Sequence, residues 1–239
     1  MRILEVEGMR KHFGGLEAVS AVDFHIDQGE IVGLIGPNGA GKTTLFNLIS
    51  GALAPTSGVT KFKGENITGL KPHQICKRGI ARTFQLVKLF GDMTVLDNVL
   101  LASLFGTSGA MDETDAKRQS DEILDFMGLA SLAGVPAKEL TLANQKRLEI
   151  ARALATKSEL LMLDEVMAGL NPTEVTQAVE LIKEIRNKGM TVFMIEHVMT
   201  AIMGISDRII VLHFGTKIAE GSPDEIAMDK KVIEVYLGL

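Results

Sequence analysis

The segment that most constrains the fold of this chain is residues 36–43, which read GPNGAGKT. It follows a short apolar run at residues 31–35, predicted as a strand, and precedes a predicted helix over about residues 42–50 that Gly51 would end. A glycine-rich turn between a strand and a helix matches a phosphate loop. The segment therefore predicts a loop that binds a polyphosphate.

The chemistry of such a loop explains its residue types. A polyphosphate needs several N–H donors at close range, and glycine lets the backbone approach because it has no Cβ atom. The N-terminus of the following helix adds partial positive charge. Lys42 is expected to reach the β- and γ-phosphates, and the Thr43 hydroxyl is expected to ligate Mg²⁺. The candidate nucleotide-binding residues here are Gly36, Pro37, Asn38, Gly39, Ala40, Gly41, Lys42, Thr43 and Thr44.

Other segments predict strands that alternate with helices. Val22, Phe24 and Ile26 alternate with Ala21, Asp23, His25 and Asp27, a pattern that predicts a half-buried strand. Three further strands are predicted at residues 160–163, 191–195 and 208–212. Apolar strands that alternate with helices favour a largely parallel sheet covered on both faces, and the early alternating strands favour an added antiparallel edge layer.

Two segments carry helix signals of their own. Residues 96–154 are predicted to be mostly helical, and the charged part at 112–122 is interpreted as a solvated helix face. Residues 171–174 predict a helix start, with Asn171 as the cap, proline at the first position and Glu174 at the third.

A pair of carboxylates follows the apolar run at residues 160–163. Burying charge is costly, so a buried strand that ends in Asp164 and Glu165 needs a reason. A bound Mg²⁺ supplies one: Asp164 would hold the ion, and Glu165 would act as general base toward an attacking water. The alternative is a surface acidic pair at a strand end.

Bulk properties exclude several classes of protein. The net charge of -5 argues against a nucleic-acid partner. Cys76 is the only cysteine, so an intramolecular disulfide and a cysteine-rich metal site are excluded. The N-terminus lacks the apolar core of a signal peptide, and no run approaches the roughly 18 apolar residues that a spanning helix needs. We expect a soluble or peripheral protein that needs a partner for any role in a membrane.

The phosphate loop and the carboxylate pair together define a phosphate-loop nucleoside triphosphatase. Further residues along the whole chain resemble the ABC transporter ATPases. Gln85 in ARTFQ resembles the glutamine loop of that family, and His197 in IEH resembles its switch histidine. The resemblance implies that Gln85 reaches metal and water, that His197 contacts the γ-phosphate, and that Phe13 stacks under adenine. An ordinary core position is the alternative for Phe13. The implied catalytic residues are Glu165, His197 and Gln85, and the implied metal ligands are Thr43, Gln85 and Asp164.

Two segments depart from the family pattern. The signature, usually Leu-Ser-Gly-Gly-Gln, reads LTLAN at residues 140–144, whereas residues 145–154 fit the family well. Thr141 keeps the hydroxyl and Ala143 keeps a small side chain, but Leu142 and Asn144 are changes. The resemblance implies that this segment binds the γ-phosphate of ATP on a second subunit, so the changes bear on how tightly it does so. Asn171 stands where aspartate is more frequent, and it remains a good helix cap. The signature residues are Thr141, Leu142, Ala143 and Asn144.

The resemblance also implies a domain organisation and partners. One domain, 1–239, would comprise an α/β nucleotide-binding core (1–90 and 157–239) and a helical signature subdomain (91–156), so the expected fold is an α/β phosphate-loop cassette with a mostly parallel core sheet and an antiparallel β edge layer. Two cassettes, identical or paralogous, would pair head to tail on membrane permease subunits at the cytoplasmic face of the inner (plasma) membrane. A periplasmic or extracellular solute-binding protein would act indirectly. Residues 86–102 are apolar enough either to form part of the permease dock or to belong to the helical core.

Five segments resemble the ATPases of branched-chain amino-acid importers: 13–16, 79–85, 93–96, 168–171 and 232–238. The expected function is therefore ATP binding and hydrolysis that drive such an importer through closure of an ATP-bound dimer. Urea importers and lipopolysaccharide-extraction systems share much of this pattern, so the solute rests on resemblance alone.

Other functions stay open to different degrees. A lipid-export ATPase fits the same motifs. A soluble ABC protein of ribosomes or DNA usually has two cassettes or a long coiled-coil insertion, and neither is present. A slow regulatory cassette of an unequal pair would fit the altered signature, but Glu165 and His197 are intact. A GTPase lacks support because there is no Asn-Lys-x-Asp segment.

Overall fold

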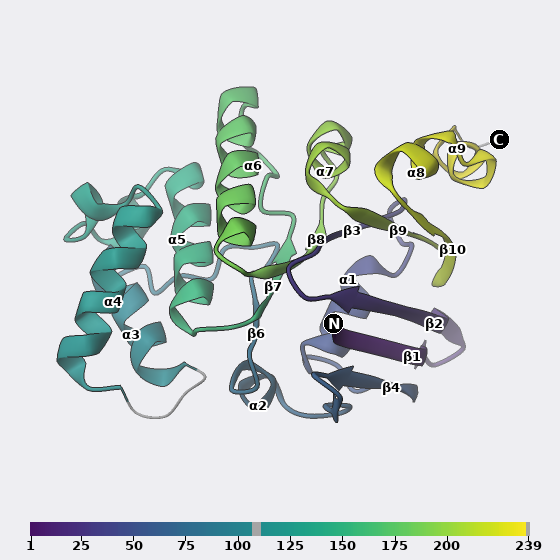
Figure 1. Ribbon diagram of the computed structural model, residues 1–239, viewed down its shortest axis with the longest axis horizontal. Coiled ribbons are helices and arrows are strands. Elements are labelled where there is room, and N and C mark those ends of the chain that lie inside the picture. Colours follow the sequence, from purple (N-terminus) through teal and green to yellow (C-terminus); the bar gives the residue numbers. More distant parts are fainter. Residues whose placement is uncertain (107–110, 238–239) are drawn as a thin grey trace.

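The framework of the protein is a six-stranded, mostly parallel sheet, seen in a computed structural model that describes residues 1–106 and 111–237 (Figure 1). Only β10 is antiparallel to its neighbour β9; the other described pairs of this sheet are parallel. In sheet order the strands are β10 (Thr216–Gly221), β9 (Arg208–His213), β3 (Ile31–Ile35), β8 (Thr191–Ile195), β7 (Leu160–Asp164) and β6 (Ile80–Arg82). The predicted strands at 31–35, 160–163, 191–195 and 208–212 are confirmed.

A separate antiparallel sheet confirms the predicted edge layer. Val22, Phe24 and Ile26 of β2 are buried, whereas Ala21 and Asp23 are exposed, as the alternation predicts. The strands in order are β2 (Leu16–Asp27), β1 (Arg2–Phe13), β4 (Ser57–Phe62) and β5 (Glu65–Asn66).

Helix α1 (Lys42–Ile49) lies between the two sheets (Figure 1). Its Phe46 ring packs against Phe193 of β8 with 4.8 Å between centroids, and Phe24 of β2 contacts the same ring at 5.5 Å. Because one apolar cluster contains side chains from both sheets and α1, the start of this helix is held in a fixed place.

The opposite face of the six-stranded sheet is covered by helices. Val32 and Leu34 of β3 face α1, whereas Ile31 and Ile35 join the second apolar cluster, so the strand is buried on both faces. Figure 1 shows α6, α7, α8 and α9 along this side of the sheet. Their bounds are α6 (Pro172–Asn187), α7 (Met199–Ile205), α8 (Pro223–Met228) and α9 (Lys230–Leu237).

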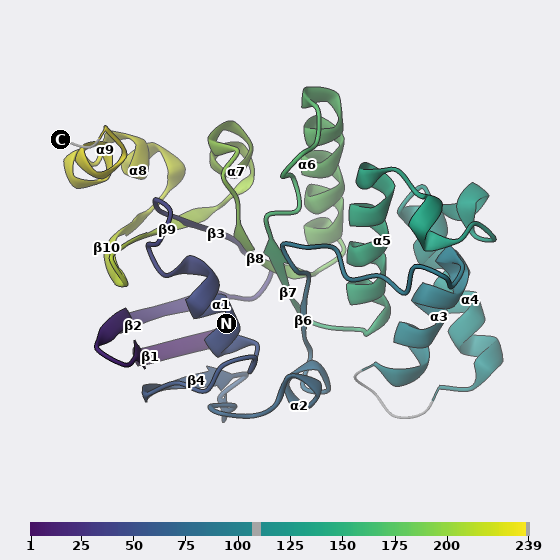
Figure 2. The same ribbon diagram turned by 180° about the vertical axis from the view of Figure 1, so that it is seen from behind.

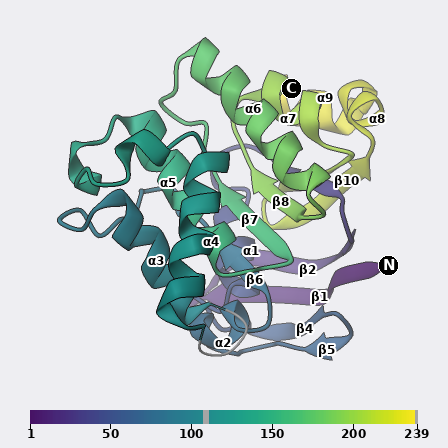
Figure 3. The same ribbon diagram turned by 60° about the vertical axis from the view of Figure 1, so that its left-hand side comes forward.

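Three helices form a group beyond β6 and β7 (Figures 2 and 3). They are α3 (Val95–Phe105), α4 (Glu113–Phe126) and α5 (Leu142–Ala155), and they pack against one another. Asp112 caps α4 by accepting from the Asp115 N–H, and Ala116 and Ser120 point inward while Lys117 and Asp121 are exposed. The helix expected at 112–122 with a solvated face is confirmed. Short helices α2 (Pro72–Cys76), η1 (Ala130–Leu132) and η2 (Ala137–Glu139) complete the described chain.

Some expectations fall outside what the structure describes. Residues 107–110, within the segment expected to be mostly helical, and Gly238, in the tail at 232–238, lie outside the described residues. The division into 1–90, 91–156 and 157–239 stays a prediction. In the described part of the chain, no helix combines the length and apolarity needed to cross a bilayer.

The start of α6 provides a test of local stability. The Asn171 side chain accepts from the Glu174 N–H at 3.0 Å, and the Glu174 carboxylate accepts from the Asn171 N–H at 2.9 Å, which confirms the predicted cap. We expect Asn171→Ala to lower the free energy of unfolding by about 1 kcal/mol in a urea titration, because one backbone donor loses its partner. Asn171→Asp keeps the acceptor and should match the parent; equal stability of the alanine variant would contradict this role.

Candidate functional site

A cavity of about 560 Å³ lies over the loop between β3 and α1. Its lining comes from the loop, the β1–β2 hairpin, the β9–β10 turn and three separate polar side chains. The lining residues are Phe13, Leu16, Glu17, Ala18, Asn38, Gly39, Ala40, Gly41, Lys42, Thr43, Thr44, Gln85, Glu165, His197, Phe214 and Gly215. The volume is in the range of pockets that hold small molecules. Gly36 and Pro37, also expected at the site, form the start of the loop and do not line the cavity among the described residues.

The loop backbone has little freedom to move away from this cavity. Gly41 has φ of 98°, and a Cβ atom there would lie 2.5 Å from the carbonyl oxygen of Ala18. At Gly36 a Cβ atom would lie 2.1 Å from the carbonyl oxygen of Leu212. No side chain caps α1, so the N–H groups of its first turn remain available for an anion.

The Lys42 ammonium lies buried inside the loop. It donates to the carbonyl oxygens of Gly36 at 2.7 Å and Pro37 at 3.0 Å. Burial lowers the pKa of Lys42, and the charges of Glu165 and Asp164 oppose that shift. The ammonium is thus bonded to the loop and lies near two carboxylates, and it supplies the positive charge that a bound phosphate needs.

The Glu165 carboxylate is held from two sides. Gln85 donates from Nε2 to Oε2 of Glu165 at 2.9 Å, and Nε2 of His197 lies 2.9 Å from Oε1. These residues follow β6, β7 and β8, three neighbouring parallel strands whose carboxyl ends meet at one edge. Glu165 has φ of 53°, a conformation that non-glycine residues rarely adopt and that is frequent at functional sites. The structure thus brings together Gln85, Glu165 and His197, as expected.

Asp164 lies deeper than Glu165 and is 1% exposed. Its Oδ2 atom pairs with Nη2 of Arg82 at 2.8 Å, and Arg82 also donates to Asn47 and Ser50 at the base of α1. Within residues 1–106 and 111–237, Oδ1 of Asp164 is buried without a hydrogen-bond partner. Thr43 and Gln85 line the cavity, whereas Asp164 does not among the described residues; the carboxylate, hydroxyl and amide oxygens of these three side chains are the kinds of donor that fit Mg²⁺.

Phe13 is at the rim of the cavity and is 46% exposed. The Lys11 ammonium lies 5.1 Å from the centroid of its ring. The alternative of an ordinary core position does not fit this exposure. Phe214, at 79% exposed, also lines the cavity and was not singled out by sequence patterns, because a lone aromatic residue in a turn gives no periodic signal.

The signature segment is elsewhere. Thr141 caps α5 and accepts from the Asn144 N–H at 3.4 Å, and Leu142 is 45% exposed. Among the described residues, none of the four, Ala143 included, lines the cavity over the phosphate loop. Within one chain, the fold does not bring the signature to this cavity.

Sequence patterns gave no role to three polar residues near the site. Lys146 of α5 donates to the carbonyl oxygen of Glu165 at 2.9 Å, and Glu196 accepts from the Met167 N–H at 2.8 Å. Burial raises the pKa of Tyr236 in α9, and the nearby backbone of Gly36 opposes that shift. A glutamate directly after a buried strand was the available signal for Glu196; the other two depend on tertiary contacts.

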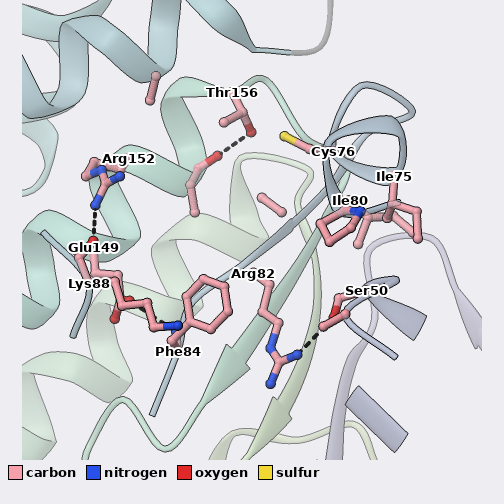
Figure 4. A pocket seen from close by; sticks show the side chains of 15 residues that line it. Ser50, Ile75, Cys76, Ile80, Arg82, Phe84, Lys88, Glu149, Arg152 and Thr156 are labelled. Carbon is pink, nitrogen blue, oxygen red and sulfur yellow. Dashed lines mark hydrogen bonds between the residues drawn. The ribbon is translucent and has the colours of Figure 1, made fainter. Parts of the chain in front are cut away.

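A second cavity, of about 300 Å³, lies between α2, β6, α3 and α5. Figure 4 shows Arg82, Phe84, Lys88, Glu149 and Arg152 around it. Its wall is largely apolar, and it continues into the segment at 86–102, in which Leu86 is 80% exposed. Within 86–102, Leu86 and Phe90 are exposed, whereas Val95 is buried and Leu89 and Leu96 pack against the core, so the segment is divided between the two alternatives.

Comparisons with known proteins agree with this geometry. Residues 19–168 match the family model of the ABC transporter, and residues 216–238 match that of the branched-chain amino acid ATP-binding cassette transporter. The chain is 45% identical to the high-affinity branched-chain amino acid transport ATP-binding protein LivG of Salmonella typhimurium, over 99% of this chain and 98% of the relative. It is 42% identical to BraF of Pseudomonas aeruginosa over the same shares. A crystal structure of the ADP conformation of an ATP-binding cassette of an ABC transporter superposes with a TM-score of 0.92, at 32% identity and full coverage of both chains.

Glu196 allows a pH test of the site. Burial raises its pKa to about 7, the nearby Glu165 adds to the shift, and the Met167 N–H and Lys146 oppose it. Because the pKa is higher in the folded than in the unfolded chain, this group stabilises the fold at low pH, and the contribution is lost as pH rises through about 7. Glu196→Gln still accepts from Met167 and stays neutral. We expect it to exceed the parent in free energy of unfolding by up to about 3 kcal/mol at pH 8, and by much less at pH 5, in urea titrations. An equal difference at both pH values would contradict the shift.

Proposed function

This chain belongs to the ABC transporter family as an ATP-hydrolysing subunit, and we propose that it drives a separate permease that imports branched-chain amino acids. The observation that carries the enzymatic part is the Glu165 carboxylate, which Gln85 and His197 hold at the phosphate-loop cavity. The match of residues 216–238 and the identity with LivG and BraF support the solute.

The residues around the loop have distinct proposed roles toward ATP. Lys42 exchanges its bonds to the Gly36 and Pro37 carbonyls for the β- and γ-phosphates, while the N–H groups of residues 38–44 surround the triphosphate. Mg²⁺, held by Thr43, Gln85 and Asp164, would neutralise phosphate charge. Glu165 accepts a proton from the attacking water, and His197 orients the carboxylate and contacts the γ-phosphate.

A second cassette completes the site in this proposal. The signature tip at Thr141 lies at the exposed start of α5 and does not line its own cavity among the described residues, so a head-to-tail partner would bring its own tip to this ATP. The helix offers unpaired N–H groups to the γ-phosphate, and Thr141 supplies a hydroxyl in place of serine. Leu142 and Asn144 change the tip without removing these donors.

The permease is proposed to dock at the second cavity and the exposed part of the segment at 86–102, in which Val95 and Val99 are buried in the core. That surface is apolar, with Leu86, Phe84 and Phe90 exposed, and it adjoins the Gln85 loop. Such docking would place the subunit at the cytoplasmic face of the membrane. A solute-binding protein would act on the far side, without contact to this chain.

The base assignment has a direct test. Glu165→Gln keeps the shape of the side chain but removes the proton acceptor, so we expect ATP turnover to fall by at least ~10²-fold while the affinity for Mg-ATP stays within a few-fold. The matched control is Glu159→Gln just before β7, whose carboxylate pairs with Lys63 at the surface and whose loss should leave turnover unchanged. Near-parental hydrolysis by Glu165→Gln would overturn the assignment.

The solute is tested in cells that depend on this gene. We expect leucine uptake to require the chain and to be lost with Glu165→Gln, whereas urea uptake should be unaffected. Urea uptake that depends on the chain, without leucine uptake, would replace the proposed solute.

Adenine stacking on Phe13 predicts a base-specific loss of binding. Phe13→Ala should weaken Mg-ATP binding by ~1–3 kcal/mol, the usual size of base stacking on an aromatic ring, and Phe13→Tyr should be nearly neutral. Binding of inorganic tripolyphosphate, which has no base, should be the same for all three proteins in calorimetry. An equal loss for both ligands would show that Phe13 supports the loop instead of the base.

A further inference from the structure

Helix α5 bonds through three charged side chains to backbone outside the helix. Lys146 donates to the carbonyl oxygen of Glu165 at 2.9 Å. Glu149 accepts from the Phe84 N–H at 3.1 Å, and Arg152 donates to the carbonyl oxygen of Lys88. The three residues are spaced by three along the helix, so they follow one side of it.

The backbone groups that these side chains bind lie at Glu165 and in the segment around Gln85. Lys146 reaches the main chain of Glu165 itself. Glu149 and Arg152 hold the segment around Gln85, from the residue before it to Lys88 (Figure 4). The side chains of Gln85 and Glu165 are hydrogen-bonded to each other at 2.9 Å. Helix α5 therefore holds the main chain at or next to both partners of that bond.

Packing alone does not account for charged residues at these positions. Lys146 and Glu149 are each 6% exposed. Burial lowers the pKa of Lys146 and raises the pKa of Glu149, which shows that each charge loses solvation. Apolar residues of similar volume would cover the same surface without this penalty; what the charges add is their attraction to one another and their contacts with backbone outside the helix. The Arg152 guanidinium also lies 4.8 Å from the Phe90 ring centroid.

The same helix begins at the signature. Thr141 caps α5, and its 14 residues run as one continuous helix to Ala155. A displacement of the tip therefore moves the three side chains with it, since an α-helix transmits displacement along its axis with little internal change.

We propose that Lys146, Glu149 and Arg152 are positioning residues for ATP hydrolysis, which fix Gln85 and Glu165 of the chain to the helix that carries its signature tip. Nucleotide at the partner's loop, by setting the position of Thr141, then sets the geometry of this chain's own base. The inference rests on the proposed role of Glu165.

The test compares two substitutions of Lys146 in the purified full-length chain with Mg-ATP. Lys146→Met removes the donor, and we expect kcat to fall by about tenfold or more while KM changes by less than about threefold, because transition-state geometry and not binding is affected. Lys146→Gln can donate an amide N–H to the same carbonyl and should restore kcat to within about threefold. Arg147→Met is the matched control on the same helix; Arg147 bonds to Gln177, and its loss should leave both constants unchanged.

A double-mutant cycle separates positioning from general stability. If Lys146 acts through Glu165, Lys146→Met should not lower the residual rate further in the Glu165→Gln background. A further tenfold loss there, or a parental kcat for Lys146→Met beside an inactive Glu165→Gln, overturns the positioning role alone. Full activity of Glu165→Gln would instead overturn the proposed base.

Arg152 provides a second route if Lys146→Met does not fold. Arg152 is partly exposed, and Arg152→Met should speed hydrogen–deuterium exchange of residues 84–90 and lower kcat, whereas Arg152→Lys, which keeps a donor, should do neither. Unchanged exchange and kcat in Arg152→Met would overturn the proposal.

Discussion

Two adjacent carboxylates at the end of a buried strand are the constraint around which the site is arranged. Asp164 and Glu165 would repel each other and lose solvation if they were left alone. Arg82 pairs with Asp164 and is bonded to α1, so charge compensation also ties β6 to the helix that follows the phosphate loop. The Glu165 carboxylate is stabilised differently, by hydrogen bonds with the Gln85 amide and with His197, and it still lines the cavity.

The sequence predicts the parts of this arrangement that depend on local patterns. Strands β3, β7 and β8 were found at their observed places because each is a continuous apolar run between turn signals. The start of α6 followed from the cap at Asn171. Gln85 and His197 were assigned by their resemblance to family motifs, and the structure shows why they meet Glu165: the three residues follow neighbouring strands of one parallel sheet.

The remaining features depend on tertiary contacts that no periodicity encodes. Helix α2 has five residues, too few for a helical period, and β10 has no fully buried residue and so no apolar run, which is why no pattern marked them. Lys146 and Glu149 lie in helix α5, where their sequence looks like that of ordinary solvent-exposed charged residues. Only the fold shows that both side chains are buried against backbone. Among the described residues the signature does not line the cavity, which is consistent with the proposed head-to-tail pair.

Among the described residues the two cavities share no lining residue, but hydrogen bonds connect residues of the second cavity to the candidate site. Arg82 lines the second cavity and pairs with Asp164 at 2.8 Å, while Glu149 lines it and holds the residue before Gln85. A protein segment docked there would therefore contact side chains that are one bond away from the proposed metal ligand and from the glutamine loop. Since packed interiors transmit displacement, a permease docked there as proposed would act on Asp164 through Arg82 and on the residue before Gln85 through Glu149 of α5. In that proposal, permease state and nucleotide state would influence each other without any contact between permease and nucleotide.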